Sequence, residues 1–372
     1  MRVLVVIGTR PEAIKLFPLV HALRSNGAFD VTICETGQHP KLTRDVLDFA
    51  GIDREYSFDL DRSANTPLVA VTAELLTKLD DVIARETPDW VVVQGDTQSV
   101  LVGAMAGHYR RVRIAHVEAG LRSGDLSSPW PEEANRRMIA QIASLHFAPT
   151  PASGDALVSE GVAKSSIVVT GNTIVDALDW TRRRIAADRT ITPRADEIIG
   201  KANGRELALV TAHRRESWGE GIASIVRAVA NLSRRDDTLF VWPLHANPAV
   251  RDEIEKTLND EAGVVLTEPL DYPNFVRLLS EATLVLTDSG GIQEEAPSFG
   301  VPVLVMRDTT ERQEGVEAGT ARLVGTEPDA IVRLTNDLLG DPVMRSAMKA
   351  RGNPFGDGQA SRRIVEALLD AG

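Results

Sequence analysis

The sequence predicts an α/β protein built from two Rossmann-like, doubly wound parallel-sheet domains, and three observations support this fold class. Short runs of aliphatic and β-branched residues alternate with longer amphipathic stretches, a pattern typical of βαβ units. These runs are too numerous for one ordinary sheet. The chain has 372 residues, which is more than a single compact domain usually holds.

The first part of the chain is expected to form the first of these domains. Its candidate strands are Arg2–Ile7, Val31–Glu35, Trp90–Gln94, Arg113–Val117 and Leu145–Ala148. The candidate helices between them include Pro11–Arg24, Leu68–Glu86 and Pro131–Ser144. The opening apolar run looks like the core of a signal peptide, but no small-residue cleavage site follows it, so we expect a buried strand.

The same alternation continues through the rest of the chain. The further candidate strands are Ile167–Thr170, Glu206–Thr211, Leu239–Pro243, Gly263–Leu266, Leu284–Thr287 and Pro302–Val305. We place the domain boundary next to Gly171. This boundary assigns residues 1–171 to the first domain and residues 172–355 to the second.

The composition limits the partners and the compartment of the protein. A formal net charge of −12 argues against nucleic acid as the main partner, although a local site for a small phosphate ligand is compatible with it. No uninterrupted apolar run in the sequence is long enough to span a bilayer, so no membrane partner is expected. Cys34 is the single cysteine, so no intrachain disulfide can form, and we expect a cytoplasmic protein.

Doubly wound sheets bind their ligands outside the carboxyl ends of the strands. The residues that directly follow the candidate strands are therefore informative, and they are polar, charged or glycine-rich. These segments are Gly8–Glu12, Thr36–His39, Gly95–Thr97, Glu118–Arg122, Ala212–Glu216, His245–Pro248 and Asp288–Gly291. We expect the active site in the cleft between the two domains.

The turn Ser289-Gly290-Gly291 predicts a phosphate-binding site. The first backbone N–H groups of a helix are unpaired, and glycines let an anion approach them closely. Glu294 and Glu295 are expected in the first turn of the following helix, where the dipole stabilises carboxylates, with one of them reaching a ribose. The alternative is a tight turn without a ligand, followed by two glutamates that only balance the dipole.

A second strand-to-helix turn follows the first candidate strand. Thr9 and Glu12 have the spacing of a capping box, and Pro11 suits a first helical turn, so these residues have a structural explanation. Arg10 is not explained in this way. An arginine at this point suits bidentate phosphate binding, with Lys15 one turn further on. The alternative is a solvated arginine at a helix start.

The first domain places three carboxylates after strands or in a proline-flanked loop, at Asp96, Glu118 and Glu132. Paired carboxylates in a cleft act as general acids and bases when their surroundings separate their pKa values. The alternatives are structural. Asp96 could be a helix N-cap together with Thr97, and Glu132 with Glu133 could cap a helix start.

His213 follows a candidate strand and is itself followed by Arg214 and Arg215, an arrangement that favours a phosphate ligand, although a single histidine is more often structural. His245 ends another strand. No histidines have the spacing of a zinc site and only one cysteine is present, so no metal is expected. The sequence also lacks a Gly-x-Gly-x-x-Gly fingerprint and a P-loop. The residues alone indicate a nucleotide-sugar enzyme that needs no cofactor.

Taken together, these motifs resemble the non-hydrolysing UDP-N-acetylglucosamine 2-epimerases, which have the two-domain fold of the GT-B glycosyltransferases. Each motif alone is weak evidence, but the set is specific and runs from one end of the chain to the other. The matching segments are GTRPEAIK (Gly8–Lys15), GQH (Gly37–His39), GDT (Gly95–Thr97), HVEAGLRSGD (His116–Asp125), SPWPEEANR (Ser128–Arg136), GNTIVDAL (Gly171–Leu178), AHRRES (Ala212–Ser217), HANP (His245–Pro248), TDSGGIQEEAPSFGVPVLVMRDTTER (Thr287–Arg312) and NPFGDGQAS (Asn353–Ser361).

The resemblance implies reversible interconversion of UDP-GlcNAc and UDP-ManNAc at C2 of the sugar, which would supply ManNAc units for cell-surface polysaccharide. The C2 proton is not acidic, because no carbonyl is attached to the ring there. The family mechanism therefore implies elimination of UDP to give 2-acetamidoglucal, followed by reprotonation on the other face and re-addition of UDP. A homodimer is also implied.

The resemblance assigns roles to individual residues of this chain. The catalytic positions of the family correspond to Asp96, Glu118, Glu132 and His213. The positions that contact UDP correspond to Arg10, Phe275, Ser289, Gly290, Gly291 and Glu295, with Phe275 near the uracil, Glu295 at the ribose and Lys15 expected beside Arg10. Residues matching a regulatory substrate pocket of bacterial members are Gln38, His39, Glu132, Arg214 and His245.

This chain also departs from the family pattern at several positions. Lys41 stands where a second glutamine is common, and the loop 61–67 differs, so substrate activation is the weakest of these implications. Gln94 stands where histidine is common before Gly-Asp-Thr. The family further implies that a C-terminal helix, Gln359–Ala371, packs back on the first domain, which would add residues 356–372 to it.

Three other functions are compatible with the motifs to a lesser degree. A hydrolysing relative would release ManNAc and UDP, but Pro11 and the loop Trp130–Glu133 favour the non-hydrolysing family. A GT-B glycosyltransferase would need an acceptor site and would not need three carboxylates in its first domain. A non-catalytic nucleotide-sugar binding protein would not need them either. Fold analogy alone does not separate these functions, so the choice depends on the site residues.

Overall fold

The computed structural model describes the whole chain except residues 39, 61–65, 215–217 and 246. Its contacts divide the chain into two compact units, Met1–Ala177 together with Gly356–Gly372, and Leu178–Phe355. Each unit contains one parallel sheet with helices on both of its faces. That residues 1–171 with 356–372 and residues 172–355 are separate domains stays a prediction.

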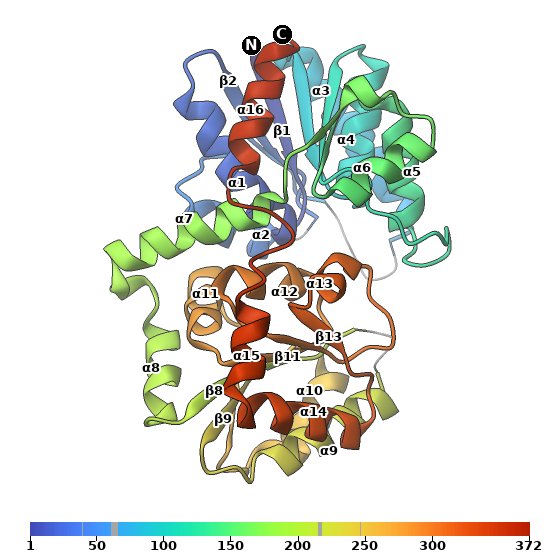
Figure 1. Cartoon of the computed structure of the whole chain (residues 1–372). Helices are drawn as coiled ribbons and strands as arrows, with labels where there is room; N and C mark the ends of the chain where they lie inside the picture. The colour runs from blue at the N-terminus through green and yellow to red at the C-terminus, as the bar shows by residue number, and fades with distance from the viewer. Residues whose placement is uncertain (39, 61–65, 215–217, 246) are drawn as a thin grey trace. The chain divides into compact units, whose positions relative to one another are not determined.

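In the first unit, seven strands among the described residues form one sheet. Figure 1 labels β1 and β2 of this sheet and several of the helices around it. They are β1 (Arg2–Ile7), β2 (Asp30–Glu35), β3 (Tyr56–Ser57), β4 (Trp90–Gln94), β5 (Arg113–Val117), β6 (Leu145–Ala148) and β7 (Ile167–Val169). Their order is β3-β2-β1-β4-β5-β6-β7, and the pairings are parallel. β1 and β4 are valine-rich and buried along almost their whole length, as expected for strands covered on both faces.

The helices of the first unit follow its strands in the chain. They are α1 (Arg10–Ser25), α2 (Pro40–Phe49), α3 (Leu68–Glu86), α4 (Gln98–Tyr109), α5 (Glu132–Ile142), α6 (Pro151–Ser159) and α16 (Ala360–Asp370). α7 (Thr173–Ala187) begins in the first unit and continues into the second. The buried stripe of α3, which includes Val71, Leu75 and Leu79, has the four-residue spacing of an amphipathic helix.

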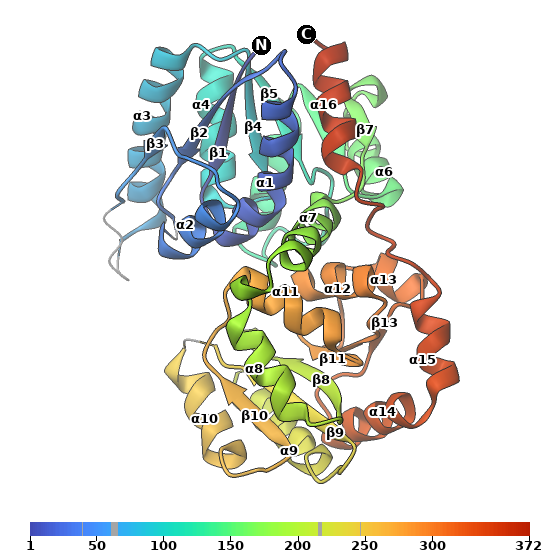
Figure 2. The ribbon, with the colours of Figure 1, turned by 90° about the vertical axis from the view of Figure 1, so that its left-hand side faces the viewer.

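The last helix, α16, packs against α1 and so joins the first unit from the far end of the chain. Figure 2 shows both ends of the chain at the same end of this unit. The Asp176 carboxylate accepts hydrogen bonds from the N–H groups of Ala360 and Ser361 at 3.2 and 2.8 Å. Because the first N–H groups of a helix lack partners within it, Asp176 stabilises the start of α16. Ile364 and Leu368 are fully buried on its inner face.

In the second unit, six strands among the described residues form a sheet of the same kind. They are β8 (Glu206–Thr211), β9 (Thr238–Pro243), β10 (Val264–Thr267), β11 (Leu284–Thr287), β12 (Val303–Val305) and β13 (Ala321–Leu323). Their order is β10-β9-β8-β11-β12-β13, again with parallel pairings. The helices are α8 (Pro193–Ala202), α9 (Glu220–Leu232), α10 (Pro248–Leu258), α11 (Tyr272–Glu281), α12 (Gly290–Glu295), α13 (Gln313–Glu317), α14 (Pro328–Gly340) and α15 (Pro342–Lys349).

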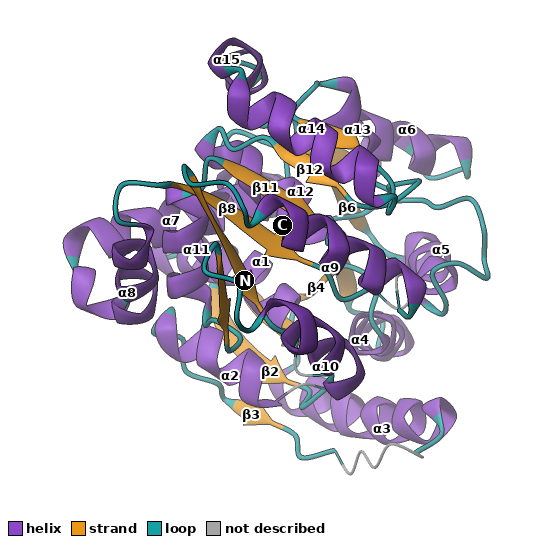
Figure 3. Ribbon diagram, turned by 90° about the horizontal axis from the view of Figure 1, so that it is seen from below, coloured by secondary structure: helices purple, strands orange, loops and turns teal. Residues whose placement is uncertain are grey.

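Two apolar clusters cover the two faces of the second sheet, and Figure 3 shows its strands between helices. Neighbouring residues of β8 enter different clusters. Val210 packs with Ile225 of α9 on one face, and Leu209 packs with Leu278 of α11 on the other. This alternation is the period-2 pattern of a strand buried on both sides. Within the described part of the chain, the helices are too short or too polar to cross a bilayer.

The predicted fold class is confirmed, because both units are doubly wound α/β sheets with parallel strands. The predicted strands agree with the observed ones to within a residue or so at their ends. Two edge strands, β3 and β13, were not predicted from the sequence. Both are only two or three residues long, and this is too short to produce an apolar period of their own.

The strand order reverses once in each sheet, between β1 and β4 in the first and between β8 and β11 in the second. The crevice outside the carboxyl ends of the strands at such a switch point is where doubly wound sheets bind ligands. Arg10 and Asp96 follow β1 and β4, whereas His213 and Asp288 follow β8 and β11. The fold therefore places predicted site residues at both switch points.

We expect Leu368→Ala to lower the free energy of unfolding by about 2–5 kcal/mol, because it removes a fully buried side chain from α16 and leaves a cavity. Urea denaturation followed by circular dichroism measures this change. Leu369→Ala is the matched control, since Leu369 is 39% exposed, and its effect should stay within about 0.5 kcal/mol. Equal effects of the two substitutions would contradict the packing of α16 on the first unit.

Candidate active site

A buried carboxylate, that of Glu12, bridges the first switch point. Its Oε2 accepts a hydrogen bond from the N–H of Gly8 at 2.6 Å, and its Oε1 accepts the hydroxyls of Thr9 and Thr97, each at 2.8 Å. Thr9 follows β1 and Thr97 follows β4, so Glu12 ties the two strand-end loops together. Burial raises the pKa of Glu12 to about 7, although these three hydrogen bonds act in the opposite direction.

The predicted capping box of Thr9 and Glu12 is wrong in its details. In a capping box the N-cap hydroxyl accepts a hydrogen bond from the helix, and the glutamate accepts the N-cap N–H. Thr9 is the N-cap of α1, but its side chain accepts no such bond and instead donates to Glu12. The Glu12 carboxylate accepts the N–H of Gly8, the residue before the N-cap, in place of the N–H of Thr9. It takes this position because it also accepts the hydroxyl of Thr97, which follows β4.

Glu118 follows β5, and its carboxylate lies against two donors. Nζ of Lys15 is 2.7 Å from both oxygens, and the side-chain amide of Gln94 donates to Oε2. All three side chains are almost fully buried. Both oxygens accept hydrogen bonds, as a carboxylate rather than a carboxylic acid does.

The backbone of Glu118 is also unusual. Its φ is +62°, in the left-handed region that non-glycine residues seldom adopt. This conformation costs about 1–3 kcal/mol and persists only where the surrounding structure enforces it. The first unit therefore holds Glu118 in a fixed place at the edge of its sheet.

Asp96 follows β4 and is paired with an arginine. Nε of Arg136, in α5, is 2.8 Å from Oδ2 of Asp96, and the Asn135 side chain donates to the Asp96 carbonyl at 2.8 Å. The N-cap of α4 is Thr97. Asp96 is therefore not the helix N-cap, which was the structural explanation considered for it. Its side chain is one-quarter exposed, which leaves part of the carboxylate open to a ligand.

Two adjacent glutamates begin α5, and the structure separates their roles. The carboxylate of Glu133 is fully buried and accepts hydrogen bonds from the N–H of Ser123 and from Arg136 and Arg137, at 3.0–3.1 Å. Burial alone would raise the pKa of Glu133, but these hydrogen bonds outweigh it and lower the pKa. Glu133 is thus structural, whereas Glu132 is half-buried and its carboxylate has no hydrogen bond within the described part of the chain.

Two further predicted residues of the first unit lie at the same edge of the sheet. Arg10 is the first residue of α1, with Pro11 in the first turn, and it is partly exposed. Gln38 follows β2, and its side-chain oxygen accepts a hydrogen bond from the Ser99 hydroxyl of α4 at 2.8 Å. This contact links the predicted regulatory residue Gln38 to the helix that follows Asp96.

A second buried carboxylate bridges the switch point of the second sheet. Asp288 follows β11, and its Oδ2 accepts hydrogen bonds from the N–H groups of His213 and Arg214, both at 2.8 Å. These two residues follow β8, so Asp288 fixes the course of the backbone there. The ring of His213 is stacked on that of His245, which follows β9, with the centroids 5.4 Å apart and the planes 11° from parallel.

The surroundings of His213 lower its pKa. Burial has the largest effect and lowers it, and the nearby His245 and Arg214 act in the same direction, whereas Asp288 raises it. An anion placed beside the ring would favour the imidazolium form. The protonation of His213 therefore depends on which charges lie next to it.

The predicted phosphate-binding turn lies beside two arginines. Ser289 is the N-cap of α12, and its side chain forms no hydrogen bond with the helix start. A Cβ added to Gly290 would lie 3.4 Å from Nη2 of Arg214 and 3.5 Å from Cζ of Arg312, whereas one added to Gly291 would meet nothing closer than 3.9 Å. The glycines thus leave open backbone next to two guanidinium groups, and this combination favours an anion.

The expectation that Glu294 and Glu295 lie in the first turn of their helix is wrong. α12 begins at Gly290 itself and contains six residues, so the glutamates are its last two and the dipole at its start does not stabilise them. Glu294 is almost fully buried and its Oε1 accepts a hydrogen bond from Nε of Arg312 at 2.7 Å. Its role is to hold that arginine beside the glycine turn.

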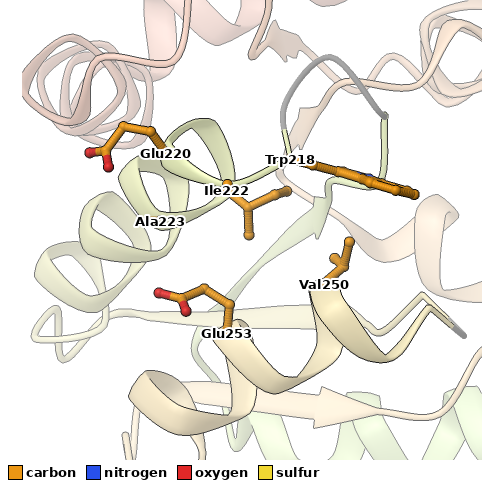
Figure 4. A pocket seen from close by; sticks show the side chains of 7 residues that line it. Trp218, Glu220, Ile222, Ala223, Val250 and Glu253 are labelled. Atoms are coloured by element: carbon orange, nitrogen blue, oxygen red, sulfur yellow. The ribbon is translucent and has the colours of Figure 1, made fainter.

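A pocket of about 370 Å³ lies between α9 and α10 in the second unit, and Figure 4 shows its lining. Trp218, Ile222 and Val250 form its apolar side, and Glu253 extends from α10. The indole N–H of Trp218 donates to the carbonyl oxygen of His213 at 3.1 Å. The wall of the pocket is therefore attached to the segment that carries His213.

Phe275 lies in α11 and packs, partly buried, against the apolar cluster on one face of the second sheet. No group of three or more His, Cys, Asp or Glu side chains among the described residues is arranged to hold a metal ion. Of the remaining expectations, His39 and residues 61–65 of the loop 61–67 lie outside the described residues.

The structure gathers the predicted residues at two separate sheet edges. The first unit brings together Arg10, Lys15, Gln38, Asp96, Glu118 and Glu132. The second unit brings together His213, Arg214, His245, Ser289, Gly290 and Gly291. Their convergence in one cleft stays a prediction.

Four residues at these edges were not assigned a role at the site from the sequence: Glu12, Gln94, Asp288 and Arg312. A local signal existed for two of them, because Gln94 and Asp288 are polar residues at or directly after the end of a buried strand. Arg312 lies far along the chain from the glycine turn that it flanks, so no local pattern could have identified it.

Comparisons with known proteins agree with these features. A family model described as UDP-N-acetylglucosamine 2-epimerase matches residues 21–369. The UDP-N-acetylglucosamine 2-epimerase of Escherichia coli (strain K12) is 46% identical over 370 residues, covering 99% of this chain and 98% of that protein. The probable UDP-N-acetylglucosamine 2-epimerase of Ralstonia nicotianae is 47% identical over 369 residues, with the same coverage of 99% and 98%.

A solved structure extends the similarity to the fold. The crystal structure of UDP-GlcNAc 2-epimerase from Neisseria meningitidis bound to UDP-GlcNAc is similar to this chain with a TM-score of 0.93. The two sequences are 41% identical, and the match covers 100% of both chains. The resemblance drawn from the motifs is therefore confirmed, and the chain belongs to the UDP-N-acetylglucosamine 2-epimerase family.

Proposed function

We propose that this protein catalyses the reversible, non-hydrolysing epimerisation of UDP-GlcNAc to UDP-ManNAc at C2 of the sugar. The observation that carries the proposal is the set of carboxylates after β4 and β5, where Glu118 is held by Lys15 and Gln94, and Asp96 by Arg136. A protein that only bound a nucleotide sugar would not need buried, oriented carboxylates there. The relative from Neisseria meningitidis, which was crystallised with UDP-GlcNAc, supports the substrate.

The chemistry begins with an elimination. A base removes the C2 proton, the C2–H electron pair forms a double bond between C1 and C2, and the bond between C1 and the phosphate oxygen breaks. The products are 2-acetamidoglucal and UDP, which retains the bonding electrons. A proton is then delivered to the other face of C2, and a UDP oxygen attacks C1. The sequence of steps is redox-neutral and balances with proton donors and acceptors alone.

Asp96, Glu118 and Glu132 supply the acid and base groups in this proposal. Glu118 accepts three hydrogen bonds as a carboxylate, so it is able to take up a proton. Lys15 carries the compensating charge at 2.7 Å. Glu132, with an open carboxylate half-exposed at the start of α5, is a second group able to exchange protons.

The second unit supplies stabilisation of the departing diphosphate. Charge develops on the phosphate oxygens as the C1–O bond breaks, and donors already in place at that point lower the barrier most. Ser289, Gly290 and Gly291 offer backbone N–H groups, and the guanidinium groups of Arg214 and Arg312 flank the turn. Arg10 is the corresponding cation of the first unit. We also propose that His213 donates a hydrogen bond to the diphosphate.

The remaining contacts of the nucleotide complete the proposal. Phe275 is proposed to lie near the uracil and Glu295 at the ribose. Gln38, Arg214 and His245 are proposed to take part in activation by a second substrate molecule. For His245, its close packing on His213 is the supporting observation, because it gives a direct route from such a ligand to the catalytic histidine.

Three broader expectations belong to the same proposal. The enzyme is proposed to act in the cytoplasm, to form a homodimer and to supply ManNAc units for cell-surface polysaccharide. The buried, unpaired thiol of the single cysteine supports a reducing compartment. Family membership supports the other two expectations.

The function is tested by proton and phosphorus NMR of UDP-GlcNAc incubated with the protein in deuterated water. We expect UDP-ManNAc to appear with deuterium at C2 and with the diphosphate intact, because reprotonation at C2 uses solvent-exchangeable hydrogen. Accumulation of free UDP and ManNAc would assign the protein to the hydrolysing class. Transfer of the sugar only after an acceptor is added would indicate a glycosyltransferase.

Glu118→Gln should bind UDP with nearly unchanged affinity and lose turnover by a factor of about 10²–10⁴, because the amide keeps the shape of the side chain but cannot exchange the proton. Isothermal titration with UDP and the NMR assay measure the two quantities separately. Glu366→Gln, at an exposed position of α16, is the matched control and should retain full turnover. Turnover of Glu118→Gln near the wild-type value would remove Glu118 from the mechanism.

Gly291→Ala should weaken UDP binding by about tenfold or more, since the added methyl group occupies the space that a phosphate needs beside the backbone. The fold should tolerate it, because a Cβ there would meet nothing closer than 3.9 Å. Gly200→Ala makes the same change at an exposed position of α8 with no atom within 4 Å, so it should leave UDP affinity unaltered. Equal affinities of the two variants would refute the phosphate-binding role of the turn.

A further inference from the structure

One carboxylate oxygen of Asp288 lacks a hydrogen bond. Oδ2 accepts the N–H groups of His213 and Arg214, whereas Oδ1 is buried and has no hydrogen-bond partner among the described residues. The side chain is fully inaccessible to solvent. A buried carboxylate oxygen is seldom left without a partner, because nothing then offsets its desolvation. Oδ1 is therefore available to accept one more hydrogen bond from a neighbouring donor.

The group next to this oxygen is the imidazole of His213. Nδ1 lies 3.7 Å from Oδ1, slightly beyond hydrogen-bond distance but close enough for a direct electrostatic effect. A small rotation of the ring would bring the two atoms into hydrogen-bond contact. The backbone cannot move away, since Oδ2 of the same carboxylate binds the N–H of His213.

Two other groups near this ring, among the residues that the structure describes, act against a positive charge on it. His245, from the end of β9, is stacked on the ring, and a proton on it repels a proton on His213. Arg214 is the next residue in the chain and also disfavours the imidazolium, while its own guanidinium lies 3.7 Å from Glu311. Within the described part of the chain, Asp288 is the neighbour of the ring that favours the charged form.

We propose that Asp288 is a positioning residue for His213. Its Oδ1 receives Nδ1–H, which turns Nε2 toward the glycine turn, and its charge stabilises the imidazolium when a diphosphate occupies that turn. The proposal rests on the proposed function and deepens it, because it explains how His213 becomes a charged donor although His245 and Arg214 disfavour the charge. One carboxylate thus does two things, fixing the backbone through Oδ2 and the ring through Oδ1.

The role in the reaction follows from the charges. When the C1–O bond breaks, negative charge collects on the phosphate oxygen, and Nε2–H of the imidazolium donates to it. No proton has to leave His213 in this step, and Asp288 does not become protonated. When UDP adds back, the same hydrogen bond weakens as the oxygen regains its bond to C1.

The proposal is tested by following the ring protons of His213 by NMR as the pH is varied, in the wild-type protein and in Asp288→Asn. Asparagine keeps an oxygen that can accept the two backbone N–H groups, and it places a neutral NH2 group, which is not an acceptor, where Oδ1 lies. We expect the midpoint of His213 to fall by about one pH unit in the variant, since the interaction that favours the imidazolium is lost. His213→Gln identifies the signal, because it removes it.

A matched control separates a local effect from the loss of one negative charge. Asp260 is exposed in the same unit, and Asp260→Asn should leave the midpoint of His213 unchanged. A midpoint that is equally unchanged in Asp288→Asn would overturn the proposal. An equal shift in both variants would also overturn it, since it would show only a general effect of net charge.

A second measurement needs no substitution at Asp288. Nitrogen-15 shifts of the His213 ring, recorded above its pKa, report which nitrogen carries the proton, and we expect it on Nδ1. A proton on Nε2 in the neutral ring would contradict the orientation that we propose. Both NMR measurements are made without substrate, so they stand even if the protein proves not to be an epimerase.

The pH dependence of kcat then connects the contact between Asp288 and His213 to the reaction. Because Asp288 raises the pKa of His213, its loss lowers that pKa, and the protonated ring disappears at a lower pH. The alkaline limb of the kcat profile of Asp288→Asn should therefore move to lower pH by about one pH unit, with KM changing less than kcat. An unshifted alkaline limb in an active variant would refute the catalytic part of the proposal while leaving the proposed function intact.

Discussion

A buried carboxylate that cannot be left without partners organises each unit of this protein. Glu12 accepts hydrogen bonds from the loops after β1 and β4, and Asp288 accepts them from the loop after β8 while itself following β11. Desolvating such a group is costly unless donors surround it, so the loops have to converge on it. The convergence occurs at the switch point, which is also where the fold leaves room for a ligand. The need of each buried carboxylate for hydrogen-bond donors thus fixes the positions of the strand-end loops at the candidate site.

The distribution of charge gives the two sheet edges different chemistry. At the first edge Lys15 is paired with the carboxylate of Glu118 and Arg136 with that of Asp96, so their charge is compensated without being removed. At the second edge, arginines flank a turn with little side-chain bulk. A chain with a net charge of −12 therefore still places two guanidinium groups beside the glycine turn, each of them close to a glutamate. The local arrangement of charged groups at the two sheet edges thus cannot be read from the overall charge.

Sequence reasoning succeeded where a short pattern decides the structure. Fully buried parallel strands require apolar runs such as Trp90–Gln94, so the strands and the residues that follow them could be identified. It failed where the structure depends on contacts distant in the chain. The extended backbone of Ser289 sets the start of α12 at Gly290. Glu294 therefore lies at the end of this short helix and not in its first turn, and Arg312 pairs with it there. The partners of Glu118 likewise come from β4 and α1, and no spacing rule connects them.

The return of α16 to the first unit has a consequence for the synthesis of the protein. A chain emerging from the ribosome delivers β1–β7 long before residues 360–370, with the whole second sheet translated in between. During that interval, the face of α1 that α16 covers stays open to water and to chaperones. The first sheet can form early, but its unit is closed only by the last helix to appear. Loss of that helix by premature termination would leave an exposed apolar strip on an otherwise folded sheet, a form that quality-control proteases recognise.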